Sequence, residues 1–322
     1  MKLFAKRSTA IFGSLSAIIA VFCFSTNDVA IKFISKDYAL HLVVLIRSLV
    51  GLAVLFLFIV PLSGGIKVLH TNRLGLHLLR GFCVVFANIT FFLGLAALPL
   101  AEGVAIFFIS PLLITIFSVV FLKEIVGPRR WAAVTLGLIG VLVILRPGSA
   151  TFQTASLLPL SAAFGYATLH MLTRYIGKTE SAASMSFYIQ LTFLVVCLTL
   201  GLTIGDGKFS GWNDPSLEFL FRAWSWPSSD HYSILILIGT TSAFGGFFIS
   251  QAYRISEAAV VAPFEYIALP IAIFWGVIVF GEFPDKTTFI GIALILGSGL
   301  YIIWRETISK ETETPKTPRY RR

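Results

Sequence analysis

Several ionisable residues stand inside long apolar stretches of the first half of the sequence. Asp28 and Lys32 are four residues apart, so a helix places them on one face, where they either neutralise each other or line a substrate path. Arg47 lies in the next stretch and either snorkels to the membrane interface or binds an anion. A charge inside a membrane costs about 2.5–3.5 kcal/mol on insertion scales, so such residues generally face a cavity or a partner.

In the second half, Glu265 is the residue best placed to do chemistry. It is flanked by Tyr266, Pro263 and Pro270, and prolines in mid-span free backbone carbonyls where discontinuous carrier helices place their sites. Glu265 is therefore either a substrate or proton-coupling group or a buried structural carboxylate, and with Tyr266 it could cage a cation. His170 titrates near neutral pH and is either a proton carrier or a hydrogen-bonded packing residue.

The motifs of enzymes and of metal or nucleotide sites are missing from the sequence. The five histidines show no H-E-x-x-H spacing, and neither G-x-S-x-G nor a phosphate-binding P-loop occurs. Cys23, Cys83 and Cys197 lie singly in apolar segments, which favours packed thiols over disulfides or metal ligands. We therefore expect no catalytic residue, no metal and no cofactor, and the chain is not expected to be an enzyme.

Composition places most of the chain in lipid. Only 13% of the 322 residues are charged and 57% are hydrophobic, with a mean hydropathy of +0.87. A water-soluble fold cannot bury that much apolar surface. Lipid admits only helices and closed barrels, and the long unbroken apolar runs favour helices over the alternating pattern of barrel strands.

Ten apolar windows predict ten transmembrane helices. The first run, from residue 10, is too long for the core of a signal peptide and is taken as a retained span. The windows lie near 10–34, 40–61, 75–97, 102–122, 130–146, 154–175, 183–205, 232–253, 258–280 and 287–304. They leave a cytoplasmic N-terminus (1–9), a Trp-containing external loop (206–231) and a polar, disordered cytoplasmic tail (306–322).

The net charge of +9 reflects membrane topology. With ten spans, most Lys and Arg residues fall in the segments that share a side with the two termini. The positive-inside rule makes that side cytoplasmic. The high pI therefore needs no nucleic-acid partner.

The two halves of the sequence resemble each other, as 10–150 and 151–305. His170 takes the place of Asp28, Gln190 that of Arg47, and Ser110-Pro111 lies where the second half has Glu265. Each unit has five spans, an odd number, so the copies must insert with opposite topology. Inverted repeats are typical of secondary transporters, because two interconvertible halves provide an inward-open and an outward-open state.

These features resemble the drug/metabolite transporter superfamily, EamA type, over residues 10–305. The resemblance rests on Lys32, Arg47, Ser110-Pro111, Phe121–Glu124 and Gly137–Gly140. The stretches Ser25–Val29, Leu79–Gly81, Ala262–Tyr266 and Gly281–Lys286 look most like the bacterial S-adenosylmethionine uptake carriers, and riboflavin carriers belong to the same broad family. The resemblance implies an all-α inner-membrane protein of two inverted five-helix repeats.

The leading hypothesis is a secondary carrier that moves a small amphoteric metabolite by alternating access. An exporter of amino acids or drugs, a channel and an intramembrane enzyme are the alternatives. The expected partners are the substrate and membrane lipids, with the chain a monomer or homodimer. Residues expected to contact substrate or the coupling proton are Asp28, Lys32, Arg47, Ser110, His170, Gln190, Glu265 and Tyr266, and the expected hinges or gates are Pro111, Glu124, Pro263, Pro270 and Glu282.

Overall fold

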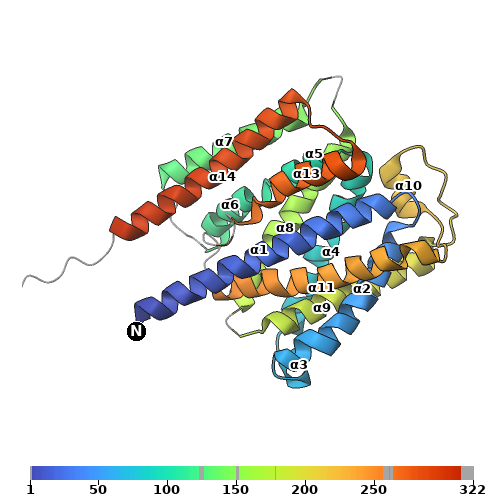
Figure 1. The fold of residues 1–322 in the computed structure, drawn as a ribbon, viewed down its shortest axis with the longest axis horizontal. Helices are drawn as coiled ribbons and strands as arrows, with labels where there is room; N and C mark the ends of the chain where they lie inside the picture. The colour runs from blue at the N-terminus through green and yellow to red at the C-terminus, as the bar shows by residue number, and fades with distance from the viewer. Residues whose placement is uncertain are drawn as a thin grey trace, which may run out of the picture.

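The computed structural model describes residues 2–122, 127–149, 152–177, 179–256, 261 and 264–312. Within these ranges the chain is all-helical and contains no strand (Figure 1). The helices are α1 (Lys2–Ile34), α2 (Leu40–Val54), α3 (Val60–Leu62), α4 (Leu74–Ala97), α5 (Leu100–Phe107), α6 (Ser110–Leu122), α7 (Pro128–Leu145), α8 (Leu157–Ile176), α9 (Ala182–Ile204), α10 (Pro215–Phe221), α11 (Tyr232–Ile255), α13 (Ala268–Phe280) and α14 (Lys286–Thr312). A π-helical turn, Leu55–Ile59, joins α2 to α3.

Seven helical segments of the described chain are long and apolar enough to cross a membrane. They are Phe12–Ile34, Leu40–Leu62, Leu74–Ala97, Leu100–Phe121, Thr154–Ile176, Ala182–Ile204 and Ser229–Ile255. The other three predicted windows overlap shorter apolar helices, Trp131–Leu145, Ala268–Phe280 and Lys286–Tyr301, and part of the window 258–280 lies outside the described residues.

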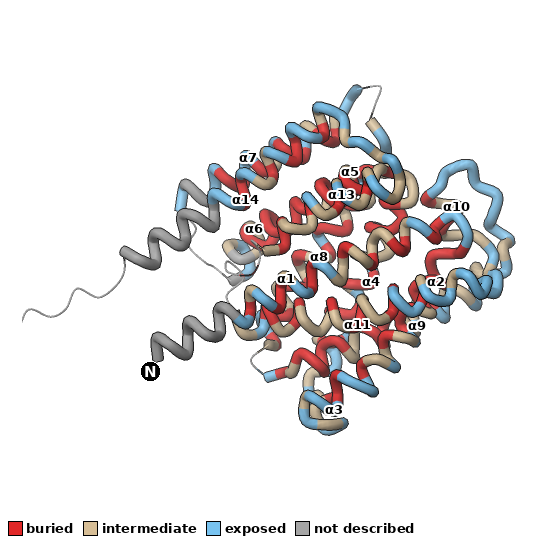
Figure 2. Tube along the Cα trace, viewed as in Figure 1, coloured by how far each residue is buried: buried red, intermediate tan, exposed pale blue. Residues whose placement is uncertain are grey.

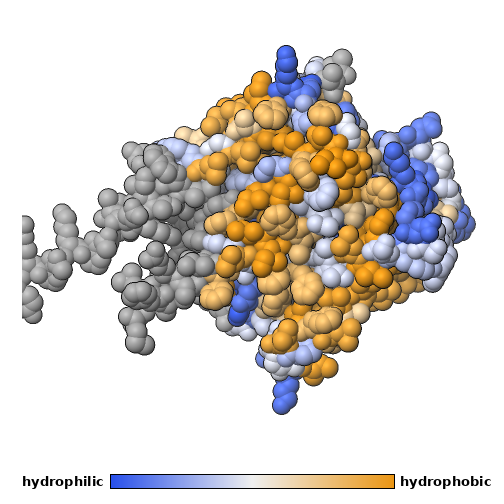
Figure 3. Space-filling model, viewed as in Figure 1, coloured by the Kyte–Doolittle hydropathy of each residue, from blue (hydrophilic) through white to orange (hydrophobic). Residues whose placement is uncertain are grey.

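The outer surface of the bundle is apolar. Large hydrophobic side chains such as Phe12, Leu57, Leu202 and Phe289 are more than half exposed. Figure 3 shows hydrophobic residues across the middle of the visible face, with hydrophilic residues gathered around α10. Side chains that lipid would solvate can remain on the surface, while buried residues line the inward faces of the helices (Figure 2).

Three long-range helix pairs organise the bundle: α1 with α11, α4 with α8, and α7 with α14. The last pair lies beside the rest of the bundle in Figure 1. A Cβ atom added at Gly140 of α7 would lie 2.9 Å from the carbonyl oxygen of Gly291 in α14. Glycine at both positions therefore lets the two backbones approach closely.

The fourth span is discontinuous. Helix α5 ends at Phe107 and α6 begins at Ser110, with Pro111 as its second residue, where a missing backbone N–H disrupts no helical bond. A similar turn, at Tyr266 and Ile267, precedes α13.

Two features at the chain ends differ from expectation. Helix α1 already begins at Lys2, inside the segment expected to precede the first span. Helix α14 continues to Thr312, so residues 306–312, predicted to be disordered, are helical, while 313–322 lie outside the described residues.

The two ends of the bundle differ in structure. The end that carries the start of α1 and the end of α14 is called the terminal end, and the opposite end the α10 end (Figure 1). The expected 206–231 loop contains α10, which begins at Pro215 after Asp214 accepts a hydrogen bond from a helical N–H. The Ser216 hydroxyl donates to the Leu93 carbonyl (2.7 Å), and this bond fastens α10 to the end of α4.

Candidate functional site

An internal cavity of about 150 Å³ lies where eight helical segments of the described chain meet. Helices α1, α2, α4 and α5 contribute lining residues from the first half of the chain. Helices α8, α9, α11 and α13, with Glu265 just before α13, contribute from the second half. Each half therefore provides four helices to one central chamber.

Five of the residues predicted to contact substrate line this cavity: Asp28, Arg47, His170, Gln190 and Glu265. The remaining three, Lys32, Ser110 and Tyr266, are not among its lining residues. Of the predicted hinge and gate residues, Glu124 and Pro263 lie outside the described residues. The cavity thus brings together both members of two expected pairs, Asp28 with His170 and Arg47 with Gln190, whereas of the third pair it includes Glu265 but not Ser110.

Arg47 is a buried cation with unused hydrogen-bonding capacity. Only 2% of its surface is exposed, so its side chain does not snorkel to the interface. Its Nη1 donates to Asn88 Oδ1 (3.0 Å), and its guanidinium lies 4.4 Å from the centroid of the Phe193 ring. Nε and Nη2 are buried without a hydrogen-bond partner, and leaving buried donors unpaired is costly. These N–H groups can bind an anion that enters the cavity.

Gln190 also retains an unused polar group. Its Nε2 donates to the Ser242 hydroxyl (3.3 Å), while Oε1 is buried without a partner. The amide packs against Gly51 of α2, where a Cβ atom would lie 2.8 Å from Nε2. Gln190 can therefore accept one hydrogen bond from a ligand.

Asp28 does not pair with Lys32, contrary to one of the two sequence-based hypotheses. Lys32 Nζ instead lies 2.8 Å from Glu282 Oε1. Asp28 lies one turn deeper on α1, lines the cavity, and makes no ion pair within the described part of the chain. The reason is geometric: the i, i+4 spacing allows a contact, but Lys32 lies close enough to the α10 end to reach the turn before α14.

Glu265 is held by two tyrosines. Tyr166 of α8 donates its hydroxyl to Oε2 (3.0 Å), and Tyr253 of α11 donates to Oε1. His170 packs between the same tyrosines, with ring-centroid distances of 4.2 Å to Tyr166 and 4.1 Å to Tyr253. Both ring nitrogens of His170 are buried without a partner. Of this cluster, Glu265, Tyr166 and His170 line the cavity, so it presents a carboxylate, one hydroxyl and an imidazole without hydrogen-bond partners.

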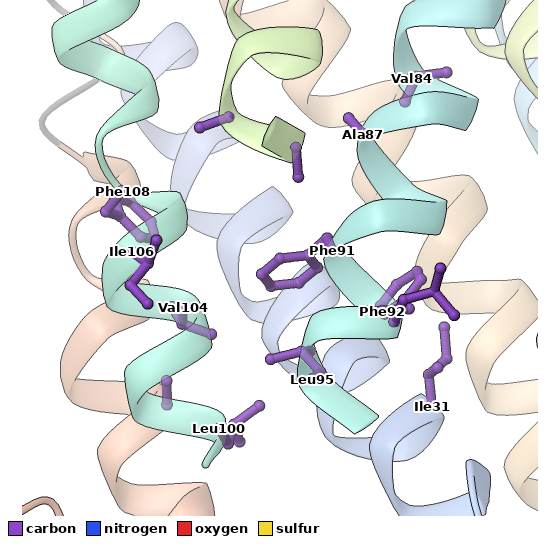
Figure 4. Close-up of a cluster of buried hydrophobic side chains, with 14 of the residues drawn as sticks. Ile31, Val84, Ala87, Phe91, Phe92, Leu95, Leu100, Val104, Ile106 and Phe108 are labelled. Carbon is purple, nitrogen blue, oxygen red and sulfur yellow. The ribbon is translucent and has the colours of Figure 1, made fainter. Parts of the chain in front are cut away.

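A row of aromatic rings extends from this cluster along the cavity. Phe91 and Phe92 project from α4, across from Phe108 at the end of α5 (Figure 4). Phe91 packs on Phe107 (4.8 Å between centroids), and Phe107 packs on Tyr166 (5.0 Å). A row of rings beside charged groups suits a ligand that is partly planar and carries charge.

Sequence reasoning missed several polar lining residues, chiefly Arg80 and Asn88 of α4. Arg80, Val84 and Asn88 recur every four residues, so they share one face of α4. That periodicity was available in the sequence, but Arg80 lies close to the start of a span, where the positive-inside rule alone accounts for a basic residue. Smaller polar groups, Ser25, Asn27, Ser186, Ser242 and Ser250, complete the polar lining.

At the α10 end, a charged cluster joins the two halves of the chain. Lys32 Nζ donates to the Leu98 carbonyl (2.6 Å) and pairs with Glu282, whose Oε2 accepts from the Leu100 N–H (2.8 Å). The cluster therefore ties α1 and the α4–α5 turn to the turn between α13 and α14. This geometry suits the gating role expected for Glu282.

Charge reversal tests this contact. We expect Lys32→Glu or Glu282→Lys alone to reduce transport at least roughly tenfold, because each leaves two like charges in a half-buried site. The double variant Lys32→Glu/Glu282→Lys restores the opposite charges and should recover a substantial part of the activity. A double variant no more active than either single variant would show that the pairing is unimportant.

A second ion pair lies beside this cluster, outside the spans. Asp285 accepts hydrogen bonds from Thr288 and from Arg146, and these bonds lower the pKa of Asp285 to about 2. Asp285 therefore remains ionised at neutral pH. Its partner Arg146 ends α7 in the left-handed conformation (φ 46°), so the pair links the α7 terminus to the start of α14.

Three of the predicted site residues, Ser110, Tyr266 and Pro270, do not line the cavity. Ser110 is buried at the start of α6. Tyr266 packs its ring on Phe108 (5.4 Å between centroids) and against Gly299 of α14, where a Cβ atom would lie 2.3 Å from the ring. Pro270 is exposed in the first turn of α13, where proline is tolerated.

The described side chains contain no cluster of three or more His, Cys, Asp or Glu residues that could hold a metal ion. The three cysteines are free thiols. The polar groups of the cavity are instead suited to bind an organic ligand by hydrogen bonds and charge.

A family model described as the EamA-like transporter family matches residues 11–146 and again 153–304. The chain is 29% identical to an S-adenosylmethionine uptake transporter of Rickettsia prowazekii, covering 90% of this chain and 91% of the relative. It is 30% identical to a riboflavin transporter of Vibrio cholerae (94% and 96% covered) and 25% identical to a pseudopaline exporter of Pseudomonas aeruginosa (88% and 93% covered).

A solved crystal structure of a protein superposes with a TM-score of 0.67 at 18% identity, covering 94% of this chain and 99% of that one. At that identity the likeness concerns the fold alone. The family match extends over nearly the whole chain and confirms the resemblance inferred from the sequence. The chain is a membrane protein that belongs to the EamA-like transporter family.

Proposed function

We propose that this protein is a secondary active transporter that moves a small amphoteric metabolite across the bacterial inner membrane by alternating access. The cavity is the observation that carries this proposal. Arg47 and Asp28 place opposite charges in one chamber, and Gln190 and His170 add unpaired polar atoms. A ligand with an anionic group, a cationic group and a planar part would satisfy this lining.

An inverted pair of five-helix repeats would supply the two states. The family model matches two successive stretches, and each stretch contributes four helices to the cavity lining. Ten spans follow if the three shorter apolar helices also cross the membrane. The two halves can then rock about the cavity, and the Lys32–Glu282 contact opens in one state and closes in the other.

Counterflow in proteoliposomes tests the proposal. S-adenosylmethionine and riboflavin are the first compounds to load, since relatives of this chain carry these names. We expect saturable uptake of a labelled compound when the unlabelled compound is preloaded, because a carrier exchanges substrate between its two faces. Uptake that does not saturate and is not stimulated by preloading would indicate a channel.

Export is the second candidate for the direction of transport. The relative named as a pseudopaline exporter shows that this family also includes proteins with exporter names. Comparing uptake by right-side-out and inside-out vesicles under the same ion gradients distinguishes import from export.

The proposed topology places the terminal end in the cytoplasm. In a variant without native cysteines, we expect Asn72→Cys to react with a membrane-impermeant maleimide only from the cytoplasmic side, and Asn213→Cys only from outside. Both asparagines are exposed in the structure and lie in connecting segments near opposite ends of the bundle. The reverse pattern of labelling would overturn the orientation, and labelling of both from one side would overturn the ten-span count.

A further inference from the structure

Arg80 of α4 is a second buried cation in the cavity and has no role in the arrangement described so far. Only 1% of its surface is exposed. Its Nε donates to the Thr173 hydroxyl (3.0 Å), and its Nη1 is buried without a partner. No carboxylate of the described chain forms an ion pair with it. A buried guanidinium held by one neutral hydrogen bond is costly to the unliganded protein, which points to a ligand that compensates it.

The position of Arg80 relative to Arg47 is fixed by α4. Asn88, which accepts the hydrogen bond from Arg47, follows Arg80 by eight residues on the same helix. A rise of 1.5 Å per residue separates the two positions by about 12 Å along the helix axis. Because α4 runs from the terminal end toward the α10 end, Arg80 is the arginine closer to the terminal end (Figure 1).

The cavity face of α4 between Arg80 and Asn88 is apolar. Val84 and Ala87 lie between Arg80 and Asn88 on the cavity face of α4. On α11, Gly246 and Ser250 present small residues to the same cavity. An anionic group leaving Arg47 would find no other cation along this part of α4 before it reaches Arg80.

We propose that Arg80 is a second anion-binding station of the transport path, which receives the carboxylate or other anionic group of the substrate on the side of the terminal end. Arg47 holds that group nearer the α10 end. This inference rests on the proposed transport function. It adds the sequence of binding steps: the anionic group passes from one arginine to the other as the substrate crosses the chamber.

Side-specific kinetics test the proposal. S-adenosylmethionine, which carries a carboxylate, and its decarboxylated analogue are presented at each face of oriented proteoliposomes. For Arg80→Gln we expect the half-saturation constant for S-adenosylmethionine to rise at least roughly tenfold at the terminal-end face and less than about threefold at the other face, as loss of one charge-assisted hydrogen bond predicts. The constant for the decarboxylated analogue should change less than about threefold at both faces.

Thermal unfolding of the unliganded protein gives a test that does not require transport of any compound. We expect Arg80→Gln to leave the unfolding temperature unchanged or to raise it, because it removes a buried charge that has no ion-pair partner within contact distance in the described chain. Thr173→Val is the matched control: it removes the acceptor of Arg80 Nε while keeping the arginine, and should lower the unfolding temperature.

The outcomes separate the two claims. If the wild-type protein shows no counterflow with S-adenosylmethionine or riboflavin, the proposed function is contradicted. The unfolding temperature of Arg80→Gln then tests the role of Arg80 independently of transport. A marked fall in that temperature for Arg80→Gln would assign Arg80 a structural role and overturn the station. An equal rise of the half-saturation constant at both faces would overturn it as well. Arg80→Lys, which keeps the charge but loses the planar fork, serves as a second variant and should show a smaller rise confined to the terminal-end face.

Discussion

Replacing Arg47 by Gln is expected to reduce transport roughly ten- to hundredfold. The reduction should come from weaker substrate binding, seen as a higher half-saturation constant, and not from a lower maximal rate. The two unpaired N–H groups of Arg47 are available for an anion, and hydrogen bonds to charged groups contribute about 1.5–3 kcal/mol each. Because 1.4 kcal/mol is a factor of ten in binding, losing one such bond gives the stated range. The measurement is the half-saturation constant and maximal rate of counterflow in proteoliposomes.

Two further variants serve as controls for the effect of Arg47→Gln. Arg47→Lys keeps the charge but loses the planar fork, and should be intermediate. Arg254→Gln removes an exposed arginine at the terminal end and should transport normally. If Arg47→Gln showed normal affinity, the anion would bind elsewhere in the cavity, and the assignment of Arg47 would fail.

Replacing Glu265 by Gln is expected to reduce transport at least roughly tenfold while the protein remains folded. Glutamine has nearly the same volume, and its amide oxygen can still accept from Tyr166 or Tyr253, so packing should survive. The variant loses the negative charge and the capacity to take up a proton, which a substrate-binding or proton-coupling group needs. Uptake should be measured over a range of pH, together with the unfolding temperature.

The matched control is Glu102→Gln, which changes a partly buried glutamate that is not among the lining residues of the central cavity. It should transport at least about half as fast as the wild type. Normal uptake and an unchanged pH profile in Glu265→Gln would exclude the proposed role. A large fall in unfolding temperature together with lost uptake would instead make Glu265 a structural carboxylate.

Much of the site could be predicted because polar residues are rare in apolar helices. Asp28, Arg47, His170 and Gln190 were found in this way, and all four line the cavity. Their positions required only that charged and amide groups avoid lipid. The internal similarity then paired them across the two halves.

The rotation of a helix about its axis could not be predicted where all of its faces are apolar. Ser110 and Tyr266 lie in such segments; both are buried outside the cavity lining, and Tyr266 packs on Phe108. The partner of Lys32 could not be predicted either, because Glu282 is 250 residues away along the chain, whereas Asp28 is only four residues away. Local spacing shows which contacts are possible, and the tertiary packing selects among them.

Arg80 illustrates a different limit. A basic residue near a predicted span end satisfies the positive-inside rule, so the sequence offers a sufficient explanation that involves no cavity. Only the packing of α4 against α8 shows that the side chain is buried beside Thr173.

Cysteine accessibility inside the cavity tests the central claim, that this chamber is the transport site, most directly. Ala87 lines the cavity on α4, next to Asn88, and Ala87→Cys in a variant without native cysteines places one thiol there. We expect a membrane-impermeant maleimide to label this thiol from either face, and a saturating concentration of a transported compound to suppress labelling from both. Labelling that is unaffected by a compound the protein transports would contradict the assignment of this cavity as the substrate site.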